Sequence, residues 1–303
     1  MSFDHEDRWV LQASDQAELD RRAEEEGIAQ DALMESAGRS AADWLLEHLR
    51  PHRAVVLVGP GGNGGDALVV ARRLHEAGVD AHTFLVAPSD ALSTAAERML
   101  NRLRGTGAGA RDVSAGDLGE LEDALLDADC VVDGLFGSGL TRALDGQYLA
   151  AVGRLNDSTV PTVSLDLPSG LASDRGALLG GAVCADITLA MAFLKPAHLL
   201  YPAAARCGNV AVVGVDYPRS ALSDATPWAR VCEQAGIRRR LPERQAAGHK
   251  GTFGRVLVVA GARGMTGAAM LCCRAAFRAG AGLVTLAAPA SVNPILEGAL
   301  PET

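Results

Sequence analysis

Aromatic residues are scarce in this sequence, since Phe, Trp and Tyr together make up 4% of its 303 residues. The core must therefore be built from Ala, Val and Leu, because hydrophobic residues still account for 48% of the chain. Long apolar runs are also missing: no stretch reaches the roughly 18 uncharged residues that span a bilayer. The first ten residues, MSFDHEDRWV, are acidic and contain no apolar signal segment. These absences predict a cytoplasmic globular protein with no membrane partner.

Cysteine and histidine form no metal-binding pattern. The six cysteines, at 130, 184, 207, 232, 272 and 273, make no CxxC and stand at no zinc spacing to a histidine. We expect buried, reduced thiols, and the adjacent Cys272 and Cys273 would point to different faces of a predicted helix. Basic residues are also outnumbered by acidic ones. The net charge of −9 argues against nucleic acid as a general partner.

What the sequence does contain is a regular alternation of apolar runs and helical patterns. Residues 11–50 predict two helices, and helical stretches follow at about 65–78, 92–104 and 116–127. Apolar strands are predicted at 54–58, 81–86, 130–133, 162–165, 187–191 and 210–214. Strands this apolar are covered on both faces. We therefore predict an α/β fold, a three-layer, Rossmann-like, mostly parallel sheet with helices on both faces.

The pattern changes after residue 215. Residues 216–248 hold three prolines, many charges and no clear period, which predicts a linker or a wrapping arm. A second βαβ beginning follows, with RVLVVAG as strand, TGAAMLCCRAAFRAG as helix and GLVTLAAP as strand. The predicted organisation is thus a domain over 1–215, an arm over 216–248 and the start of a further domain over 249–303. One helix and two strands bury little surface alone, so we expect this further domain to be incomplete.

The glycine-rich stretch GPGGNGGDAL, residues 59–68, fits no standard nucleotide loop well. It satisfies GxGxxG after a strand, but the next strand does not end in the acid that reads a ribose. In a P-loop frame, Gly65 and Asp66 stand where Lys and Ser/Thr belong. The simplest alternative is a tight turn in which Asp66 caps the helix.

Two further loops make a ligand site the better interpretation. One predicted strand ends in Asp133 and runs into GLFGSGLTRAL, and another ends in Asp166 and runs into LPSGL. Loops that follow parallel strands share the carboxyl edge of the sheet, where ligands bind. Asn63, Asp133 and Ser169 offer oxygen ligands that suit a hard cation rather than zinc.

Other residues near these loops carry candidate roles. GSGLTR, residues 137–142, predicts a phosphate nest with one arginine. Asp166 is a candidate general acid and base. The segment FLKPAHLLYPAA offers Lys195 and His198, for which a structural role is the simpler interpretation although either residue could border the pocket.

In order, these motifs resemble those of the NAD(P)H-hydrate epimerase family. The family's GxGNNGGDG, VDGLFGTGL, DxPSG and KPxH correspond to GPGGNGGDA, VDGLFGSGL, LDLPSGL and FLKPAH here, and LMESAG resembles the family's LMENAG. The resemblance covers roughly residues 11–215. Two departures are Gly62 in place of the first Asn and Ala67 in place of the closing Gly. Neither departure removes a proposed ion ligand, so we expect activity to survive.

The resemblance implies an enzyme that interconverts the R and S forms of hydrated NADH and NADPH, as a homodimer or higher homo-oligomer. It implies a potassium ion bound by Asn63, Asp133 and Ser169, with Asp166 in contact with the reacting nucleotide. The implied substrate contacts are Gly62, Asn63, Gly64, Gly65, Asp66, Gly137, Ser138, Gly139, Leu140, Thr141, Arg142, Ala143 and Asp166.

The segment from His249 onward resembles the start of the ADP-dependent NAD(P)H-hydrate dehydratase, a ribokinase-like domain. The resemblance implies ADP or ATP as cofactor only for a complete domain, with Ala268 as a candidate substrate contact here. The family's GxGD-type motif does not occur after residue 250, so we expect dehydratase activity only in a longer chain.

Two other functions remain open. A non-catalytic nucleotide- or RNA-binding module of the same domain type would have lost the loop carboxylates or gained a basic surface. This acidic chain keeps Asp66, Asp133 and Asp166. An NAD-dependent oxidoreductase would need a ribose-reading acid and a partner at the hydride site, and the sequence offers neither.

Overall fold

The computed structural model describes residues 7–223 and 225–303, which form two compact units that divide between Gly236 and Ile237. Residues 1–6 of the predicted 1–215 domain and residue 224 of the predicted arm lie outside the described residues. The arm is divided between the units, because its first part, up to Gly236, belongs to the first one.

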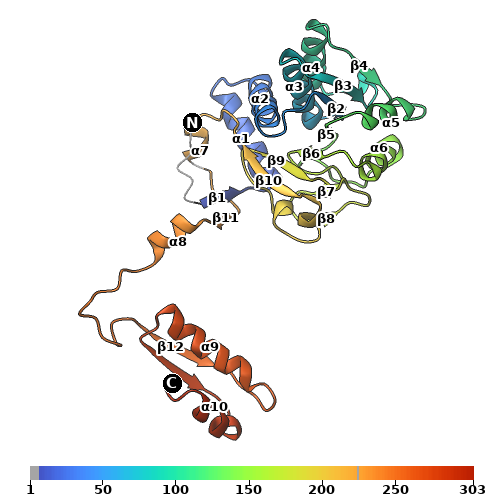
Figure 1. Ribbon diagram of the computed structural model, residues 1–303. Helices are drawn as coiled ribbons and strands as arrows, with labels where there is room; N and C mark the ends of the chain where they lie inside the picture. The colour runs from blue at the N-terminus through green and yellow to red at the C-terminus, as the bar shows by residue number, and fades with distance from the viewer. Residues whose placement is uncertain (1–6, 224) are drawn as a thin grey trace. The chain divides into compact units, whose positions relative to one another are not determined.

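A seven-stranded sheet forms the centre of the first unit (Figure 1). Its strands are β2 (Arg53–Val58), β3 (Asp80–Leu85), β4 (Ala110–Asp112), β5 (Cys130–Gly134), β6 (Thr162–Leu165), β9 (Ile187–Met191) and β10 (Asn209–Val213). Their order in the sheet is β10-β9-β6-β5-β2-β3-β4, and every neighbouring pair is parallel. The predicted parallel α/β fold is confirmed, and β4 is a short edge strand that the sequence pattern did not indicate.

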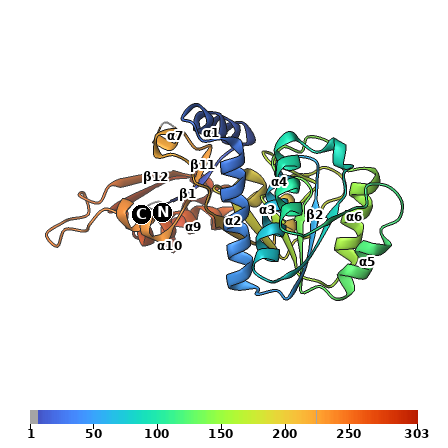
Figure 2. The same cartoon turned by 90° about the horizontal axis from the view of Figure 1, so that it is seen from above.

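Helices cover both faces of this sheet, as Figure 2 shows. The described helices of the first unit are α1 (Ala13–Glu25), α2 (Gln30–His48), α3 (Gly62–Glu76), α4 (Thr94–Gly105), α5 (Gly119–Leu126), α6 (Gly146–Asp157) and α7 (Arg219–Ser223). Helix α8 (Gln234–Arg240) of the arm contains the division between the two units. Helices α2, α3 and α4 lie on one face, and α5 and α6 lie on the other. Short 3₁₀ turns complete the unit at Ser89–Ala91, Pro196–His198 and Ala203–Arg206.

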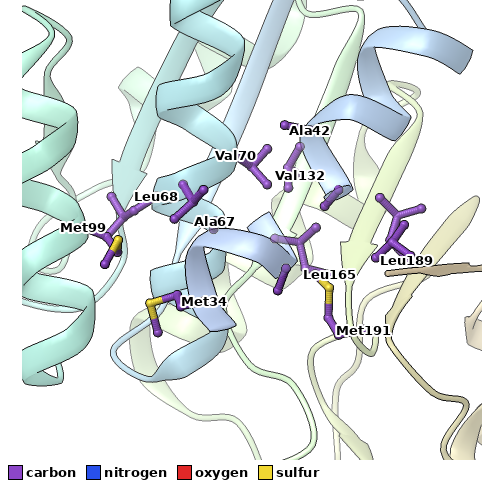
Figure 3. Close-up of a cluster of buried hydrophobic side chains, with 14 of the residues drawn as sticks. Met34, Ala42, Ala67, Leu68, Val70, Met99, Val132, Leu165, Leu189 and Met191 are labelled. Atoms are coloured by element: carbon purple, nitrogen blue, oxygen red, sulfur yellow. The ribbon is translucent and has the colours of Figure 1, made fainter. Parts of the chain in front are cut away.

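Each layer of helices has its own apolar core against the sheet. The larger core joins α2, α3 and α4 to the sheet through aliphatic side chains and methionines (Figure 3). The smaller core joins α5 and α6 to the opposite face. In the larger core, α3 and β5 approach each other closely. A Cβ added at Gly134 of β5 would lie 2.3 Å from the Cβ of Ala67 in α3. Small residues therefore bring the start of α3 down onto the strand that carries Asp133.

Several elements were not predicted from sequence. β1 (Asp7–Val10) pairs antiparallel with β11 (Ala229–Cys232) of the arm, and β7 (Leu171–Ala172) pairs antiparallel with β8 (Ala177–Leu178). These strands are short, and most of their residues are not fully buried. The sequence therefore contains no apolar run that would mark them as strands. The arm thus contributes a strand to the first unit rather than serving only as a linker.

The second unit contains a parallel pair of strands, β12 (Arg255–Val259) and β13 (Leu283–Ala287). Helices α9 (Thr266–Ala279) and α10 (Asn293–Ala299), with a 3₁₀ turn at Ala290–Val292, complete it, and the predicted strand–helix–strand order is present. Its cores are small and centre on Val258, Cys273 and Val284, and on Ala269, Val292 and Leu296.

Two expectations about the whole chain can be compared with the structure. None of its described helices combines the length and the apolar character needed to cross a bilayer. All six cysteines are free, but only Cys130, Cys207 and Cys273 are buried, so the expectation of uniformly buried thiols was wrong.

Candidate active site

The site lies where the chain reverses direction across the sheet. From β2 the chain builds β3 and β4 on one side and then returns to place β5 on the other side of β2. Loops that leave β2 and β5 diverge at such a point and open a crevice at the carboxyl edge. Asn63 follows β2, Asp133 lies in β5 and Asp166 follows β6, so the three predicted loops share this edge.

The glycine stretch begins helix α3 rather than preceding it. The helix starts at Gly62, three residues before the predicted start, and its N-cap is Gly61. Asp66 is therefore inside the helix, and the alternative that it caps the helix was wrong. Asn63 and Asp66 are one helical turn apart on the same side of α3. Glycines in the first turn let the strand before it and the loop after β5 approach closely.

Asp133 and Ser169 connect the loops that follow β5 and β6. Ser169 donates from its Oγ to Asp133 Oδ1 at 2.6 Å and from its backbone N to Oδ2 at 2.9 Å. Ser164 Oγ donates to Oδ2 at 2.8 Å, and the backbone N of Phe136 donates to Ser169 Oγ at 2.9 Å. Burial raises the pKa of Asp133, and the Ser169 and Ser164 hydrogen bonds oppose that rise. Two of the three predicted ion ligands are thus in direct contact.

The third predicted ligand, Asn63, has an unsatisfied side chain. The residue is 9% exposed, and neither its Oδ1 nor its Nδ2 has a hydrogen-bond partner. A buried amide without partners is unfavourable and points to a ligand or ion that binds there. The atoms available here to bind a metal ion are oxygens. Among the described residues, no group of three or more His, Cys, Asp or Glu side chains could hold a metal. Neutral oxygens with a single carboxylate fit a monovalent hard cation.

Asp166 lies at the centre of the site. It is 7% exposed, and its carboxylate forms a buried ion pair with Lys195 and accepts a hydrogen bond from Ser138 N at 3.0 Å. A Cβ added at Gly137 would lie 2.9 Å from Asp166 Oδ2 and 3.3 Å from Asn63 Oδ1. The absence of a side chain at Gly137 therefore leaves room between the carboxylate of one loop and the amide of another.

The two aspartates of the site have opposite electrostatic environments. Burial alone would raise the pKa of Asp166, but the Lys195 ammonium, His198 and the Ser138 hydrogen bond together lower it. Asp66 is half-buried, and its pKa is well above the usual range because of burial and the nearby carboxylates of Asp166 and Asp20. Asp166 is therefore held ionised, whereas Asp66 favours the protonated form.

The predicted phosphate segment extends from the site toward the surface. Gly137, Ser138 and Leu140 are half-buried. The remaining residues of the segment, Gly139, Thr141, Arg142 and Ala143, are exposed. The backbone N of Ser138 donates to Asp166 Oδ2 at 3.0 Å, and within the segment the backbone N of Leu140 donates to Gly137 O at 3.3 Å. Ala268 is exposed in the first turn of α9 in the second unit.

Sequence reasoning gave too little weight to Lys195 and His198, and it missed Asp20 and Tyr217. Lys195 is fully buried and pairs with Asp166, and His198 contacts the backbone of the same residue. Tyr217, at the start of the arm, donates to Asp20 of α1 at 2.5 Å. The only sequence signal for Lys195 was that the KPAH segment lies next to an apolar strand. No sequence signal indicated the Asp20–Tyr217 pair.

Comparison with known proteins now identifies the family. Residues 30–197 match the family model described as "YjeF-related protein N-terminus". This match covers more than half of the chain. The chain belongs to the YjeF-related family.

Relatives of this YjeF-related chain are named as NAD(P)H-hydrate repair enzymes. It is 38% identical over 295 residues to the "Bifunctional NAD(P)H-hydrate repair enzyme Nnr" of Thermofilum pendens, covering 97% of this chain and 56% of that protein. It is 36% identical over 294 residues to the enzyme of the same name from Moorella thermoacetica, covering 95% and 56%. The predicted family is confirmed, and the chain spans little more than half the length of these relatives.

A solved structure has a similar architecture. The crystal structure of the yeast protein ynu0 aligns with a TM-score of 0.57 at 22% identity, covering 68% of this chain and 87% of that one. The family match ends at residue 197, within the segment that supplies Lys195 and His198. The arm residues that contact α1 lie beyond it.

Proposed function

We propose that the first unit interconverts the R and S forms of hydrated NADH and NADPH. The observation that supports the proposal is the position of Asp166, a buried carboxylate held ionised at the carboxyl edge of the sheet, next to the loop that follows β5. The names of the full-length relatives supply the substrate class.

The chemistry requires exchange of a hydroxyl group at one carbon of the nicotinamide ring. That carbon carries both the hydroxyl and the ring nitrogen, so loss of the protonated hydroxyl gives a planar iminium ion that water can re-enter from either face. Asp166 in its ionised form is the base that accepts the proton of the incoming water, and once protonated it is the acid for the same exchange in the reverse direction. Asp66, which favours the protonated form, is suited to supply the proton to the departing hydroxyl.

The remaining residues bind and orient the nucleotide. Asn63, Asp133 and Ser169 would hold a potassium ion, which when bound supplies positive charge that fixes the loops and attracts the anionic substrate. The Gly137–Ala143 segment presents backbone N–H groups and Arg142 to the phosphates. The rest of the first turn of α3, from Gly62 to Asp66, lines the same rim.

The test starts from one purified hydrate epimer and follows the other by chromatography, with the protein-free rate subtracted. We expect the wild-type chain to equilibrate the two forms and Asp166→Asn to lose at least about 100-fold in rate, since acid–base catalysis contributes ~10²–10⁴-fold. Asp157→Asn, at the exposed end of α6, is the matched control and keeps the wild-type rate. Equilibration by Asp166→Asn at the wild-type rate would reject the assignment. A wild-type chain that binds the hydrate without equilibrating it would favour the binding-module alternative.

A second candidate function concerns the second unit. The curated relatives are named bifunctional, and they match this chain over 97% and 95% of its length, both units included. The second unit therefore belongs, in our proposal, to an ADP-dependent dehydratase that uses ADP or ATP, with Ala268 at its substrate site. Adding ADP and the hydrate to a full-length homologue and to this chain, and measuring NADH formation, compares the two directly.

A further inference from the structure

Lys195 lies in an environment that leaves its ammonium group no freedom. The side chain is fully buried. Its Nζ contacts the Asp166 carboxylate and donates to the backbone oxygens of Met191 and Phe193 at 3.1 Å each. An ammonium group has three hydrogens, and three acceptors occupy them. Lys195 is therefore unsuited to act as a nucleophile or a base, and its contacts serve to fix Asp166.

His198 holds the same aspartate through the backbone. The backbone N of Lys195 donates to His198 Nδ1 at 2.9 Å, so Nδ1 carries no hydrogen. Nε2 then carries the hydrogen and donates to the Asp166 carbonyl oxygen at 2.7 Å. Burial, followed by the charge of Lys195, lowers the pKa of His198 to about 4. The ring is neutral at physiological pH, with its tautomer set by these two contacts.

Asp166 needs such support because of its backbone conformation. Its φ of 61° lies in the left-handed region, which non-glycine residues adopt at a cost unless their surroundings hold them there. Its backbone N donates to Leu189 O at 2.8 Å, and the contacts of its carbonyl and carboxylate are those of His198 and Lys195. The aspartate is thereby held through its backbone N, its carbonyl and one carboxylate oxygen. The other carboxylate oxygen, Oδ2, accepts a hydrogen bond from the backbone N of Ser138 at 3.0 Å and faces the space at Gly137.

We propose that Lys195 and His198 act as one positioning device, in which the lysine holds the carboxylate of Asp166 and the histidine holds its backbone, so that Oδ2 faces the substrate. This inference rests on the proposed epimerase function. A buried ion pair is seldom the most stable way to fill a core, because desolvation offsets much of its attraction. A positioning role gives the chain a reason to keep this one.

The experiment uses four variants of the full chain. Lys195→Met removes the ammonium at similar length, Lys195→Arg keeps a positive charge, and His198→Gln keeps a donor and an acceptor in place of the ring. Lys250 is the only other lysine and is exposed in the second unit, so Lys250→Met is the matched control. Circular dichroism establishes that each variant is folded before its kinetics are compared.

We expect Lys195→Met to lower kcat about 100-fold with KM changed less than about threefold, because the lost contact orients the reacting group rather than binding the substrate. The acid limb of its pH–rate profile moves to higher pH, since the buried Asp166 carboxylate loses the charge that keeps it ionised. Lys195→Arg recovers part of the rate and the original acid limb. His198→Gln lowers kcat about tenfold and moves the acid limb less than Lys195→Met does, because Lys195 has the larger effect on the pKa of Asp166. Wild-type kcat in Lys195→Met, or a rise in KM alone, would overturn the proposal.

A second measurement separates this proposal from the proposed function. Carbon-13 NMR of labelled aspartate carboxyl groups, with Asp166→Asn used to assign the resonance, reports the ionisation of Asp166 without any substrate. The resonance should titrate at higher pH in Lys195→Met, or in Lys195→Gln if the methionine variant fails to fold, and should stay close to its wild-type position in Lys195→Arg, which keeps the charge. An unchanged titration refutes the positioning role even if the wild-type enzyme is active. An inactive wild-type chain with the expected shift rejects only the epimerase assignment.

Discussion

At the scale of single residues, Asn63 gives the clearest test of the ion site. Its amide is buried without partners, and burying an unsatisfied polar group costs about 1–3 kcal/mol unless a ligand compensates. Asn63→Leu replaces the amide by an apolar group of similar size. We expect potassium chloride to raise the Tm of the wild-type chain relative to choline chloride at equal ionic strength, because an ion that binds only the folded state stabilises it.

The Asn63→Leu variant should lose this potassium-dependent shift while keeping a Tm in choline chloride at or above that of the wild type. Asn101→Leu, on the exposed side of α4, is the control and should respond to potassium as the wild type does. Differential scanning calorimetry measures both shifts. If Asn63→Leu responds to potassium as strongly as the wild type, its amide is not an ion ligand.

At the scale of elements, six of the seven strands of the sheet could be predicted within a residue or two because they are apolar runs, and β2, β5 and β6 are buried along nearly their whole length. The edge strand β4 and the pair β1–β11 could not, because they are short and their alternation is weak. That Asn63, Asp133 and Asp166 lie at one edge of the sheet could be predicted, because each of them stands at or just after the end of a strand. The Lys195–Asp166 pair did not follow, since it joins residues 29 apart and depends on β9 lying next to β6.

The junction between β2 and α3 gives a second prediction at this scale. A Cβ added at Gly64 would lie 1.9 Å from the carbonyl oxygen of Gly59, whereas nothing lies within 4 Å of one added at Gly61. We expect Gly64→Ala to lower the free energy of unfolding by about 3 kcal/mol, because backbone atoms must move, and Gly61→Ala by less than about 1 kcal/mol. Urea denaturation of the two variants measures the contrast. Equal stabilities would show that the start of α3 is less tightly packed than described.

The departures from the family motif can be interpreted through the same packing. Gly62 is exposed, and no atom lies within 4 Å of an added Cβ, so the side chain that the family carries there has space at the rim. Ala67 is fully buried in α3, where Gly134 on β5 leaves room for its methyl group. Both departures therefore fit the local structure, which agrees with the expectation that they leave the ion ligands in place.

At the scale of the whole molecule, the part of the arm up to Gly236 belongs structurally to the first unit. Tyr217 donates to Asp20, the backbone N of Asp216 donates to Ser36 Oγ at 2.9 Å, and β11 pairs with β1. On its other side β1 meets the segment before Lys195: Leu11 N donates to Leu194 O at 2.9 Å, and Leu194 N donates to Trp9 O at 3.1 Å. The arm thus supports, through β1, the segment that holds Asp166.

This arrangement predicts how two shortened chains behave. A chain ending at Gly236 keeps α7, β11 and the Tyr217 contact, so we expect it to unfold within about 2 °C of the first unit in the full chain. A chain ending at Val215 lacks β11, which covers β1, and lacks Leu222, which packs in the larger core. A loss of ~2–3 kcal/mol in the free energy of unfolding of a unit of this size lowers Tm by roughly 5–10 °C. Its epimerisation rate should fall as well, because β1 no longer holds the segment that ends in Lys195. Calorimetry and the single-epimer assay on the same preparations measure both effects. If the chain ending at Val215 matches the longer one in Tm and in rate, the arm serves only as a linker, and the coupling of β11 to the site through β1 is refuted.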